Sequence, residues 1–429
     1  MPYVQPKVEI GFSPTDAFPG PFFRLDDPIA GVLDDTDFFL GGVSFYDVTD
    51  RVTSIEITRG KPRRFASFPA ASANVVFNNH DRSFDPEYKS SPFYGNIVPQ
   101  RQIRISMGSA LAFTGLVEDW NLSYLPNGDS LAQADLIDST TILAKQILPP
   151  STPVIQSTGE RVLAVLDSVN WDSRLRDIDS GTVSCGNQVI TENTNALSYL
   201  QNVASTESGL LFISKEGNLT FRNRRQYPNT DGTLFFNQDS GIPYTGIGIV
   251  YGSELLFNSI TIANEGGATA NASDTNSIIS YGQRDYTQTG LLGETDEQSA
   301  DLALFYADLY SEPEFRVETL EISIDGLSES QQAQVFALEI GDVCGIEFTP
   351  NNIGDPIVKY LQAIRISHSK LPNNHNMTFG FQEIKYFALT LDDSIFGKLD
   401  EQNVMVVGTS AWTLSDAIFG RLSAGMTVS

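Results

Sequence analysis

The chain has 429 residues, with 27 basic and 53 acidic side chains and a formal net charge of −26. A field of that sign repels phosphates and anionic lipid headgroups, which argues against binding nucleic acid or a membrane surface through bulk electrostatics. Hydrophobic residues make up 41% of the chain and aromatic residues 10%, a composition typical of a globular, strand-rich protein long enough for several compact domains.

Two further features of the composition narrow the class of protein. No window approaches 18 consecutive apolar residues, so the chain is not expected to insert into a membrane. The only cysteines are Cys185 and Cys344. Two cysteines cannot build a disulfide framework, and we predict that both are buried free thiols of a protein folded in a reducing cytosol.

The first third of the chain is predicted to form antiparallel strands of a barrel or sandwich. Apolar or alternating runs recur at residues 52–58, 73–78, 101–107 and 111–120 and are separated by polar turn sequences. The segment KPRRFASFPA, residues 61–70, combines prolines with basic residues. It is predicted to be an exposed loop rather than a strand.

The middle of the chain changes to a helical period. Apolar residues share one helical face in GERVLAVLDSVN (159–170) and in NTNALSYLQNVASTE (193–207), where Asn193 or Thr194 is available as the cap. The sequence GLLFISKEGNLTFRNR (209–224) predicts a hairpin, whose turn glycine supplies the positive φ that such turns require. Two helices and a hairpin predict a small α+β module.

The last third begins with a helix and returns to strands. In ETDEQSADLALFYADLY (294–310), Thr295 and Gln298 form a capping-box pattern. The segment 263–277 has almost no large side chains and is predicted to be a mobile loop. Four strands are expected at VETLEISI (317–324), GDVCGIEF (341–348), YLQAIRISHS (360–369) and MTFGFQEI (377–384).

The search for catalytic and metal-binding patterns argues against an enzyme. The three histidines, His80, His368 and His375, have no cysteine or second histidine at ligand spacing. We therefore expect each to be a satisfied surface or core residue. The chain also lacks a His-Glu-x-x-His sequence, a Gly-x-Ser-x-Gly elbow and a Walker loop. No catalytic residue, cofactor or metal is predicted.

One acidic loop has a calcium-like spacing. In NNHDRSFDPE (78–87), Asn79, Asp81, Ser83 and Asp85 alternate as oxygen ligands would. The loop lacks the mid-loop glycine and the terminal bidentate glutamate of an EF-hand, so an Asx-type turn is favoured over a metal site.

A set of motifs in fixed order resembles a known family. The strand VTSIEITRG (52–60) is followed by residues 68–105, which carry an Asn-rich turn and an FDP…SPF…I.P…R pattern, and then by FTGLVEDW (113–120). This order resembles the minor tail proteins of long-tailed bacteriophages, which are related to baseplate-hub proteins. Further matching segments, in the family's order, are 160–171, 176–181, 196–224, 277–286, 310–320 and 338–356.

The resemblance implies a fold class and a structural role. It implies a mainly β protein with two β-barrel-like hub domains, a small helix-hairpin module between them, and terminal docking arms. Subunits of that family form a ring, expected as a homotrimer, that continues the tail tube and lets DNA pass through its lumen. The implied location is the virion tail tip, with assembly in the host bacterial cytoplasm. The implied partners are distal tail or tube proteins, tape-measure proteins, and fibre or tip proteins.

A repeated ten-residue phrase marks both ends of the chain. LDDPIAGVLD (25–34) recurs as LDDSIFGKLD (391–400) and, more weakly, as LSDAIFGRLS (414–423). Short apolar segments of this kind bury little surface alone, so they are expected to become ordered only when they pack against another surface. That surface is either a neighbouring subunit or their own chain. We favour docking on neighbours. The predicted docking residues are Leu25, Asp27, Ile29, Leu33, Leu391, Asp393, Ile395, Phe396, Leu399, Trp412, Leu414, Ile418, Phe419 and Leu422.

These patterns divide the chain into five parts and leave two alternatives open. One alternative is a carbohydrate-binding receptor module, with Trp120, Trp171 or Trp412 as a stacking platform, although the first two lie in apolar contexts typical of a core. The other is a cell-wall glycosidase, which needs only two suitably placed carboxylates. The predicted parts are an N-terminal arm (1–44), a first hub domain (45–150), the α+β module (151–235), a second hub domain (236–387) and a C-terminal arm (388–429).

Overall fold

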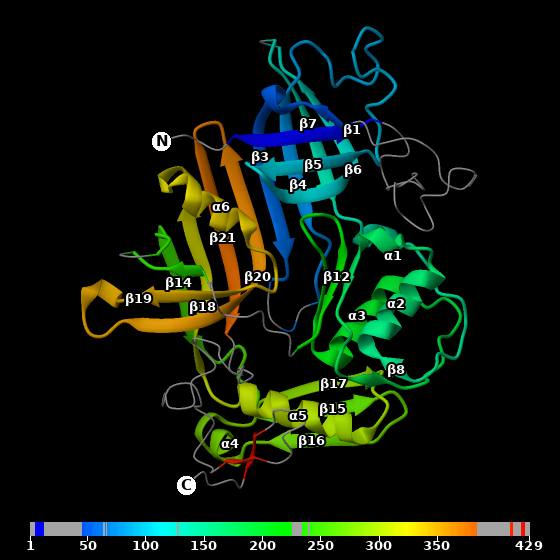
Figure 1. The fold of residues 1–429 in the computed structure, drawn as a ribbon, viewed down its shortest axis with the longest axis vertical. Helices are drawn as coiled ribbons and strands as arrows, with labels where there is room; N and C mark the ends of the chain where they lie inside the picture. Colours follow the sequence, from blue (N-terminus) through cyan, green and yellow to red (C-terminus); the bar gives the residue numbers. More distant parts are fainter. Residues whose placement is uncertain are drawn as a thin grey trace.

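The computed structural model describes residues 5–12, 45–62, 65, 67–126, 128–224, 234–238 and 241–383, and two short strands at 412–414 and 422–424. Strands make up 43% of the described chain and helices 21%, and the α-helices lie between residues 140 and 337 (Figure 1). The mainly β class with an α+β insert, predicted from the sequence, is confirmed. No described helix has the length and apolar character needed to cross a bilayer.

A sheet of thirteen strands is the framework of the molecule. All of its ladders are antiparallel except the pairing of β13 with β19. Eleven strands follow the order β14 (Gly246–Gly252), β18 (Glu314–Ser323), β21 (Asn374–Glu383), β20 (Ile357–Leu371), β3 (Val52–Gly60), β4 (Ser72–Asn78), β7 (Ser130–Ile137), β6 (Ala110–Tyr124), β5 (Gln102–Met107), β1 (Pro6–Gly11) and β2 (Phe45–Asp47). The other two lie off this path: β19 (Val343–Phe348) pairs with β20, and β13 (Leu234–Phe236) pairs with β19.

Alternation of apolar and polar residues explains why these segments are strands. In β4, Ala73, Val75 and Phe77 are buried, while the residues between them are half-buried. Strands β5 and β7 repeat this pattern, because successive side chains of a strand point to opposite faces of the sheet. Their buried side chains join one large apolar core that extends from Val8 to Phe381. That core includes a short helix, α6 (Glu329–Ala337), whose Val335 and Phe336 are buried.

The ladder between β3 and β20 joins the two predicted β regions into one sheet. β3 comes from the first third of the chain and β20 from the last, and they pair from Ile55↔Lys370 to Gly60↔Arg365. The sheet therefore runs without a break across the two regions that the sequence analysis treats as separate hub domains. The domain boundaries themselves stay a prediction.

At Gly60 the backbone of β20 leaves no room for a side chain on β3. Its φ is +101°, and an added Cβ would lie 2.1 Å from the carbonyl oxygen of Ile364 and 2.7 Å from Cα of Arg365. Both contacts are with backbone atoms, which cannot shift without a substantial cost in free energy. We expect Gly60→Ala to lower the free energy of unfolding by about 1–3 kcal/mol beyond the cost of the positive φ alone, which urea denaturation will measure.

Gly290 provides the matched control for this substitution. Its φ is +74°, but nothing lies within 4 Å of its added Cβ. Gly290→Ala therefore adds only the backbone strain, about 1 kcal/mol. Equal losses for the two variants would show that the close approach of β3 to β20 does not constrain position 60.

The α+β module packs beside the main sheet (Figure 1). Its core surrounds the buried faces of two helices, with Val162, Leu166, Leu200 and Val203 at its centre. Asn195 caps the second helix by accepting a hydrogen bond from the Ser198 amide, so the predicted caps Asn193 and Thr194 are wrong by one or two positions. The elements are α1 (Thr140–Leu143), β8 (Gln156–Ser157), α2 (Thr158–Ser168), β9 (Arg176–Ile178), β10 (Ser184–Cys185), α3 (Ala196–Glu207), β11 (Leu210–Ile213) and β12 (Leu219–Arg222).

A second small unit lies below the main sheet in Figure 1. Its strands follow the order β16–β15–β17, and α5 packs on them through Leu302, Tyr306 and Leu309. The capping box of Thr295 and Gln298 predicted for α5 is confirmed. The elements are β15 (Ser259–Asn264), β16 (Thr269–Ser273), α4 (Thr275–Tyr281), β17 (Asp285–Leu291) and α5 (Asp296–Tyr310).

Two loop predictions are wrong. Residues 263–277 are not a loop, because they include β16 and the start of α4. Small side chains suit this place, since Ala270 and Ala272 pack against the core beneath α5. Residues 61–70 are not an exposed loop throughout, because Lys61 and Phe68 are 6% and 9% exposed. The Lys61 ammonium lies 5.2 Å from the centre of the Phe68 ring, which lets a basic residue remain buried there.

Candidate functional site

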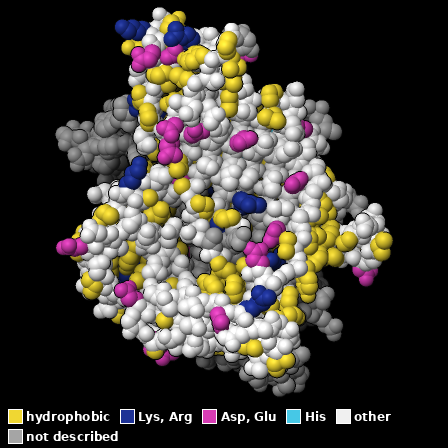
Figure 2. All heavy atoms as spheres, turned by 180° about the vertical axis from the view of Figure 1, so that it is seen from behind, with side chains coloured by type: hydrophobic (Ala, Val, Ile, Leu, Met, Phe, Trp, Pro, Cys, Tyr) yellow, Lys and Arg dark blue, Asp and Glu magenta, His cyan; other side chains and the backbone are white. Residues whose placement is uncertain are grey.

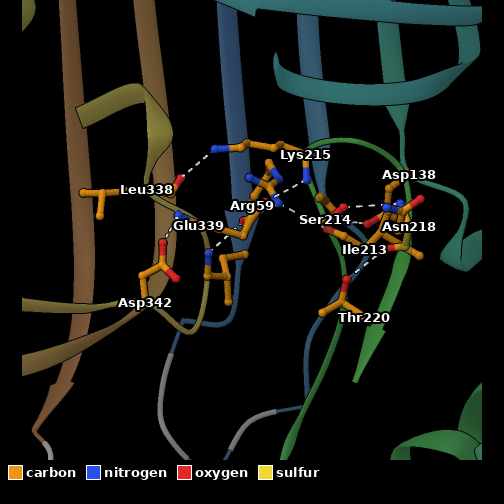
Figure 3. Close-up of polar contacts among 12 residues, drawn as sticks. Arg59, Asp138, Ile213, Ser214, Lys215, Asn218, Thr220, Leu338, Glu339 and Asp342 are labelled. Atoms are coloured by element: carbon orange, nitrogen blue, oxygen red, sulfur yellow. Dashed lines mark hydrogen bonds and ion pairs between the residues drawn. The ribbon is translucent and has the colours of Figure 1, made fainter. Parts of the chain in front are cut away.

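Three distant parts of the chain meet at a buried ion pair (Figure 3). Arg59 on β3 donates from Nη2 to Glu339 Oε1 at 2.6 Å and to the Ile213 carbonyl oxygen at 3.3 Å. The Lys215 amide, in the turn of the β11–β12 hairpin, donates to Glu339 Oε2 at 2.9 Å. The Arg59 side chain is 3% exposed and that of Glu339 19%. This junction ties the α+β module to both halves of the main sheet.

The hairpin turn also holds the end of helix α6. Lys215 Nζ donates to the carbonyl oxygens of Phe336 and Ala337 at 3.0 and 2.6 Å and to that of Leu338 at 3.3 Å. Carbonyls at a helix C-terminus have no partner inside the helix and carry partial negative charge, so a cation is stabilising there. The charged groups of this cluster therefore join the α+β module to the main sheet rather than forming a solvent-exposed reactive site.

The α+β module has two more buried charges with structural partners. Glu207 is fully buried and accepts from Thr158 Oγ1 at 2.7 Å, Thr182 Oγ1 at 2.6 Å and the Val183 amide at 3.0 Å. Arg161, 1% exposed, donates to Tyr199 Oη and to two backbone carbonyls. Both side chains are surrounded by groups that satisfy them, so neither resembles a catalytic acid or a binding residue in a cleft.

The histidines are placed as core and surface residues. The β20–β21 hairpin brings His368 Nδ1 within 3.3 Å of His375 Nε2, a pairing that their separation in sequence does not reveal. Burial lowers the pKa of His375 to about 4 and that of His368 well below its usual value. His80 lies 3.5 Å from Asp129 at the surface. The prediction of satisfied surface or core histidines is confirmed except for His375 Nδ1, which has no hydrogen-bond partner.

The oxygens of the calcium-like loop are occupied by the protein itself. Asn79 Oδ1 accepts from the Phe84 amide at 2.9 Å, and Asp81 accepts from Ser83 and from Arg51. Asp85 accepts from the Glu87 amide and pairs with Arg82. The predicted Asx-type turn is confirmed. Within the described residues no group of three or more His, Cys, Asp or Glu side chains is arranged to hold a metal ion.

The cysteines are buried free thiols, as predicted. Burial raises the pKa of Cys185 to about 11 and also raises that of Cys344. Both thiols are therefore protonated near neutral pH and are poor nucleophiles.

Two of the three tryptophans considered as sugar-stacking residues, Trp120 and Trp171, pack against the core of the protein. Trp120 stacks with Phe84 at 5.8 Å between ring centres and donates from Nε1 to the Val98 carbonyl oxygen. Trp171 is 4% exposed and donates to the Leu175 carbonyl oxygen. Neither forms an exposed stacking platform, so the core packing predicted for both is confirmed.

The predicted docking residues fall almost wholly outside the described residues. This holds for Leu25, Asp27, Ile29, Leu33, Leu391, Asp393, Ile395, Phe396, Leu399, Ile418 and Phe419. The backbone around the third phrase forms a two-stranded antiparallel ladder, β22 (Trp412–Leu414) with β23 (Leu422–Ala424), in which Leu414 pairs with Leu422. Their role in docking stays a prediction.

One sheet edge was missed by the sequence analysis. Strand β14, with the sequence GIGIVYG, pairs with β18 and has no second neighbour among the described strands. It carries no charge and no proline, the usual devices that protect an exposed edge, and Tyr251 on it is 69% exposed. The available signal was an apolar run bounded by glycines that follows a turn with Pro243 and Tyr244. This edge is the described surface best suited to pairing with another strand.

Neither a protein-family model nor a curated protein sequence matches this chain. Solved structures do match. The 43 kDa tail protein of prophage MuSo2 from Shewanella oneidensis superposes on 80% of this chain and 96% of its own, with 15% identity and a TM-score of 0.51. The tail protein from Neisseria meningitidis MC58 superposes on 89% of this chain and 97% of its own, with 10% identity and a TM-score of 0.53. The chain has the fold of phage tail proteins, and the resemblance recognised in its sequence is confirmed at the level of the fold.

Proposed function

We propose that this chain is a non-enzymatic structural component of a phage tail tip or baseplate hub. In this role it forms a closed ring, a trimer, that continues the tail tube and docks neighbouring tail proteins. The observation that carries the proposal is the fold, which is shared with two tail proteins over nearly their whole lengths. The described histidines, cysteines and acidic loop supply no catalytic constellation, which supports assembly over chemistry.

The open edge of the main sheet is the proposed contact between subunits. No described strand pairs with the outer edge of β14, and the strand carries no charged side chain. Adding a strand from a second subunit to such an edge satisfies its backbone hydrogen-bonding groups and extends the sheet. In a closed ring each edge is covered by the next subunit, so no edge stays open to aggregation.

The net charge of −26 suits a protein around a DNA channel. Figure 2 shows acidic side chains distributed in small groups over one face rather than gathered in a single patch. A broadly acidic wall repels phosphates and discourages DNA from sticking during passage. We place the protein at the virion tail tip after assembly in the host cytoplasm.

The mass of the purified protein in solution tests the ring directly. Light scattering should give a closed trimer, alone or after mixing with the other tail proteins. Tyr251→Lys places a charge on the β14 edge and should shift the mass toward the monomer, since a charged edge strand resists pairing. Tyr94→Lys, at a residue 47% exposed outside the sheet, is the matched control and should leave the mass unchanged. A wild-type monomer that joins no tail protein would overturn the proposal.

The terminal phrases are proposed to clasp neighbouring subunits or the next tail protein. Leu391→Asp combined with Leu399→Asp should weaken co-assembly, measured by pull-down with the neighbouring tail proteins, because it removes the apolar anchors of one phrase. The circular dichroism of the isolated chain should not change. A loss of folded structure in the isolated variant would instead show that the phrase packs on its own subunit.

A further inference from the structure

A cavity of about 360 Å³ lies where the main sheet, the α+β module and the β15–β17 unit meet. Its walls come from the segment that follows β3, from α3, the β11–β12 hairpin, β17 and α5, and from β20 and β21. Small-molecule sites commonly lie at such junctions and have volumes of this order. Its shape and position alone do not identify a ligand, so the side chains that line it must do so.

One wall of the cavity is aromatic. Phe65 lies 4.6 Å from Tyr286 and 4.6 Å from Tyr310, measured between ring centres, and meets Tyr306 edge to face at 5.7 Å. The Tyr306 hydroxyl donates to Ser208 Oγ at 3.0 Å, which fixes the orientation of its ring. A rigid group of rings offers apolar faces with polar rims, a surface that suits the C–H face of a sugar ring.

The rest of the lining is rich in neutral hydrogen-bonding groups. Four glutamines, Gln201, Gln288, Gln362 and Gln382, line the cavity. Gln382 donates from Nε2 to Gln362 Oε1, while its own Oε1 is buried without a hydrogen-bond partner. A buried amide oxygen left unpaired is uncommon and is satisfied when a donor such as a hydroxyl group binds beside it.

The charge of the lining is opposite to that of the chain. Among the described residues that line the cavity, Lys61 and Arg224 are the charged ones, and no aspartate or glutamate is present. The chain as a whole carries 53 acidic side chains against 27 basic ones. Arg224 is held at the wall by the Phe305 ring, whose centre lies 5.2 Å from the guanidinium carbon. A cavity with cations and no carboxylates favours an anionic ligand.

From these walls we infer that the cavity binds an acidic sugar, a pyranose unit that carries a carboxylate or a phosphate. The ring would lie against the tyrosines, its hydroxyl groups would contact the glutamines, and its acidic group would lie near Lys61 and Arg224. This assigns the chain a ligand-binding activity in addition to its proposed structural role. It also places saccharide recognition at residues other than Trp120, Trp171 and Trp412, the three candidates named from the sequence.

Saturation-transfer NMR on the full chain tests the inference with four probes. Glucuronic acid and glucose 6-phosphate should both receive saturation, while glucose, which lacks the acidic group, should bind at least about tenfold more weakly. Inorganic phosphate has no carbon-bound protons to observe, so it is added as a competitor. Because it lacks the sugar ring, it should displace glucuronic acid at least about tenfold less effectively than glucose 6-phosphate does. Arg224→Gln should reduce glucuronic acid binding by about tenfold. Gln288→Ala, at a half-buried position, should reduce it several-fold. Arg284→Gln, at an exposed arginine outside the cavity on the same unit, is the control and should bind as the wild type does.

Three results would overturn the inference. The first is no transfer to glucuronic acid or glucose 6-phosphate. The second is inorganic phosphate binding as tightly as the two acidic sugars, because that would identify a simple anion contact. The third is binding of a synthetic peptide with the sequence of residues 389–400 but of neither sugar, which would assign the cavity to the chain's own acidic phrase. Ring formation by light scattering is independent of all three, so the ligand and the proposed structural role can fail separately.

Discussion

Replacing Arg59 by alanine should lower the free energy of unfolding by about 3–5 kcal/mol. Arg59 is buried and pairs with Glu339, which also accepts the Lys215 amide. Without the guanidinium, a largely buried carboxylate loses its counter-ion at the point where three parts of the chain meet. Urea denaturation followed by circular dichroism measures the loss.

The pair of Arg51 with Asp81 is the control for this experiment. Their N–O distance is 2.7 Å, similar to that of the buried pair, but their side chains are 33% and 52% exposed. Arg51→Ala should therefore lower stability by less than about 1 kcal/mol. If the two arginine variants lost the same stability, the junction would contribute no more than an ordinary surface ion pair.

Acidification from pH 6.5 toward pH 4 should destabilise the protein through its two buried histidines. Burial lowers the pKa of His375 to about 4 and that of His368 well below the usual value, with Lys370, Arg59 and Lys215 adding repulsion. Above pH 6.5 both histidines are neutral whether the chain is folded or not. Below it the unfolded chain takes up protons that the folded chain does not, so stability falls with pH. His375 alone should account for about 3 kcal/mol across this window.

Denaturant unfolding at pH 7.5, 6.5, 5.5 and 5.0 measures this slope. His375→Gln removes the titrating group and keeps a neutral polar side chain beside Phe336, so it should flatten the dependence by about 1 kcal/mol per pH unit. His80→Gln, at an exposed histidine, should leave the slope as it is. A slope between pH 6.5 and 5.0 that is the same in all three proteins would exclude the buried histidines as its cause.

Periodicity predicted the strands and helices well because most of them have one buried and one exposed face. In β4 and α2 the apolar positions repeat with the period of the element, so their identity is readable without tertiary information. The resemblance to phage tail proteins was readable for a different reason, since turn motifs such as FDP at 84–86 keep their order along the chain. Both kinds of signal are local in sequence.

The features that sequence reasoning missed depend on contacts between distant residues. The segment 263–277 has small residues, and only packing against α5 shows that they belong to a strand and a helix. The contact of His368 with His375 requires the register of the β20–β21 hairpin. The cavity takes residues from six helices and strands that no spacing connects. Such sites can be found only after the fold is known.

The ladder between β3 and β20 also constrains how the protein folds. Gly60 pairs with Arg365, so about 300 residues separate two neighbours in one sheet. Contacts of such long sequence separation form slowly, because the intervening chain must be ordered first. During synthesis at about 5–20 residues per second, β3 would wait roughly 15–60 s for its partner strand, with its edge unpaired. The first β region is therefore the part of the nascent chain most exposed to misassembly, and the subunit cannot complete its main sheet until nearly the whole chain has been made.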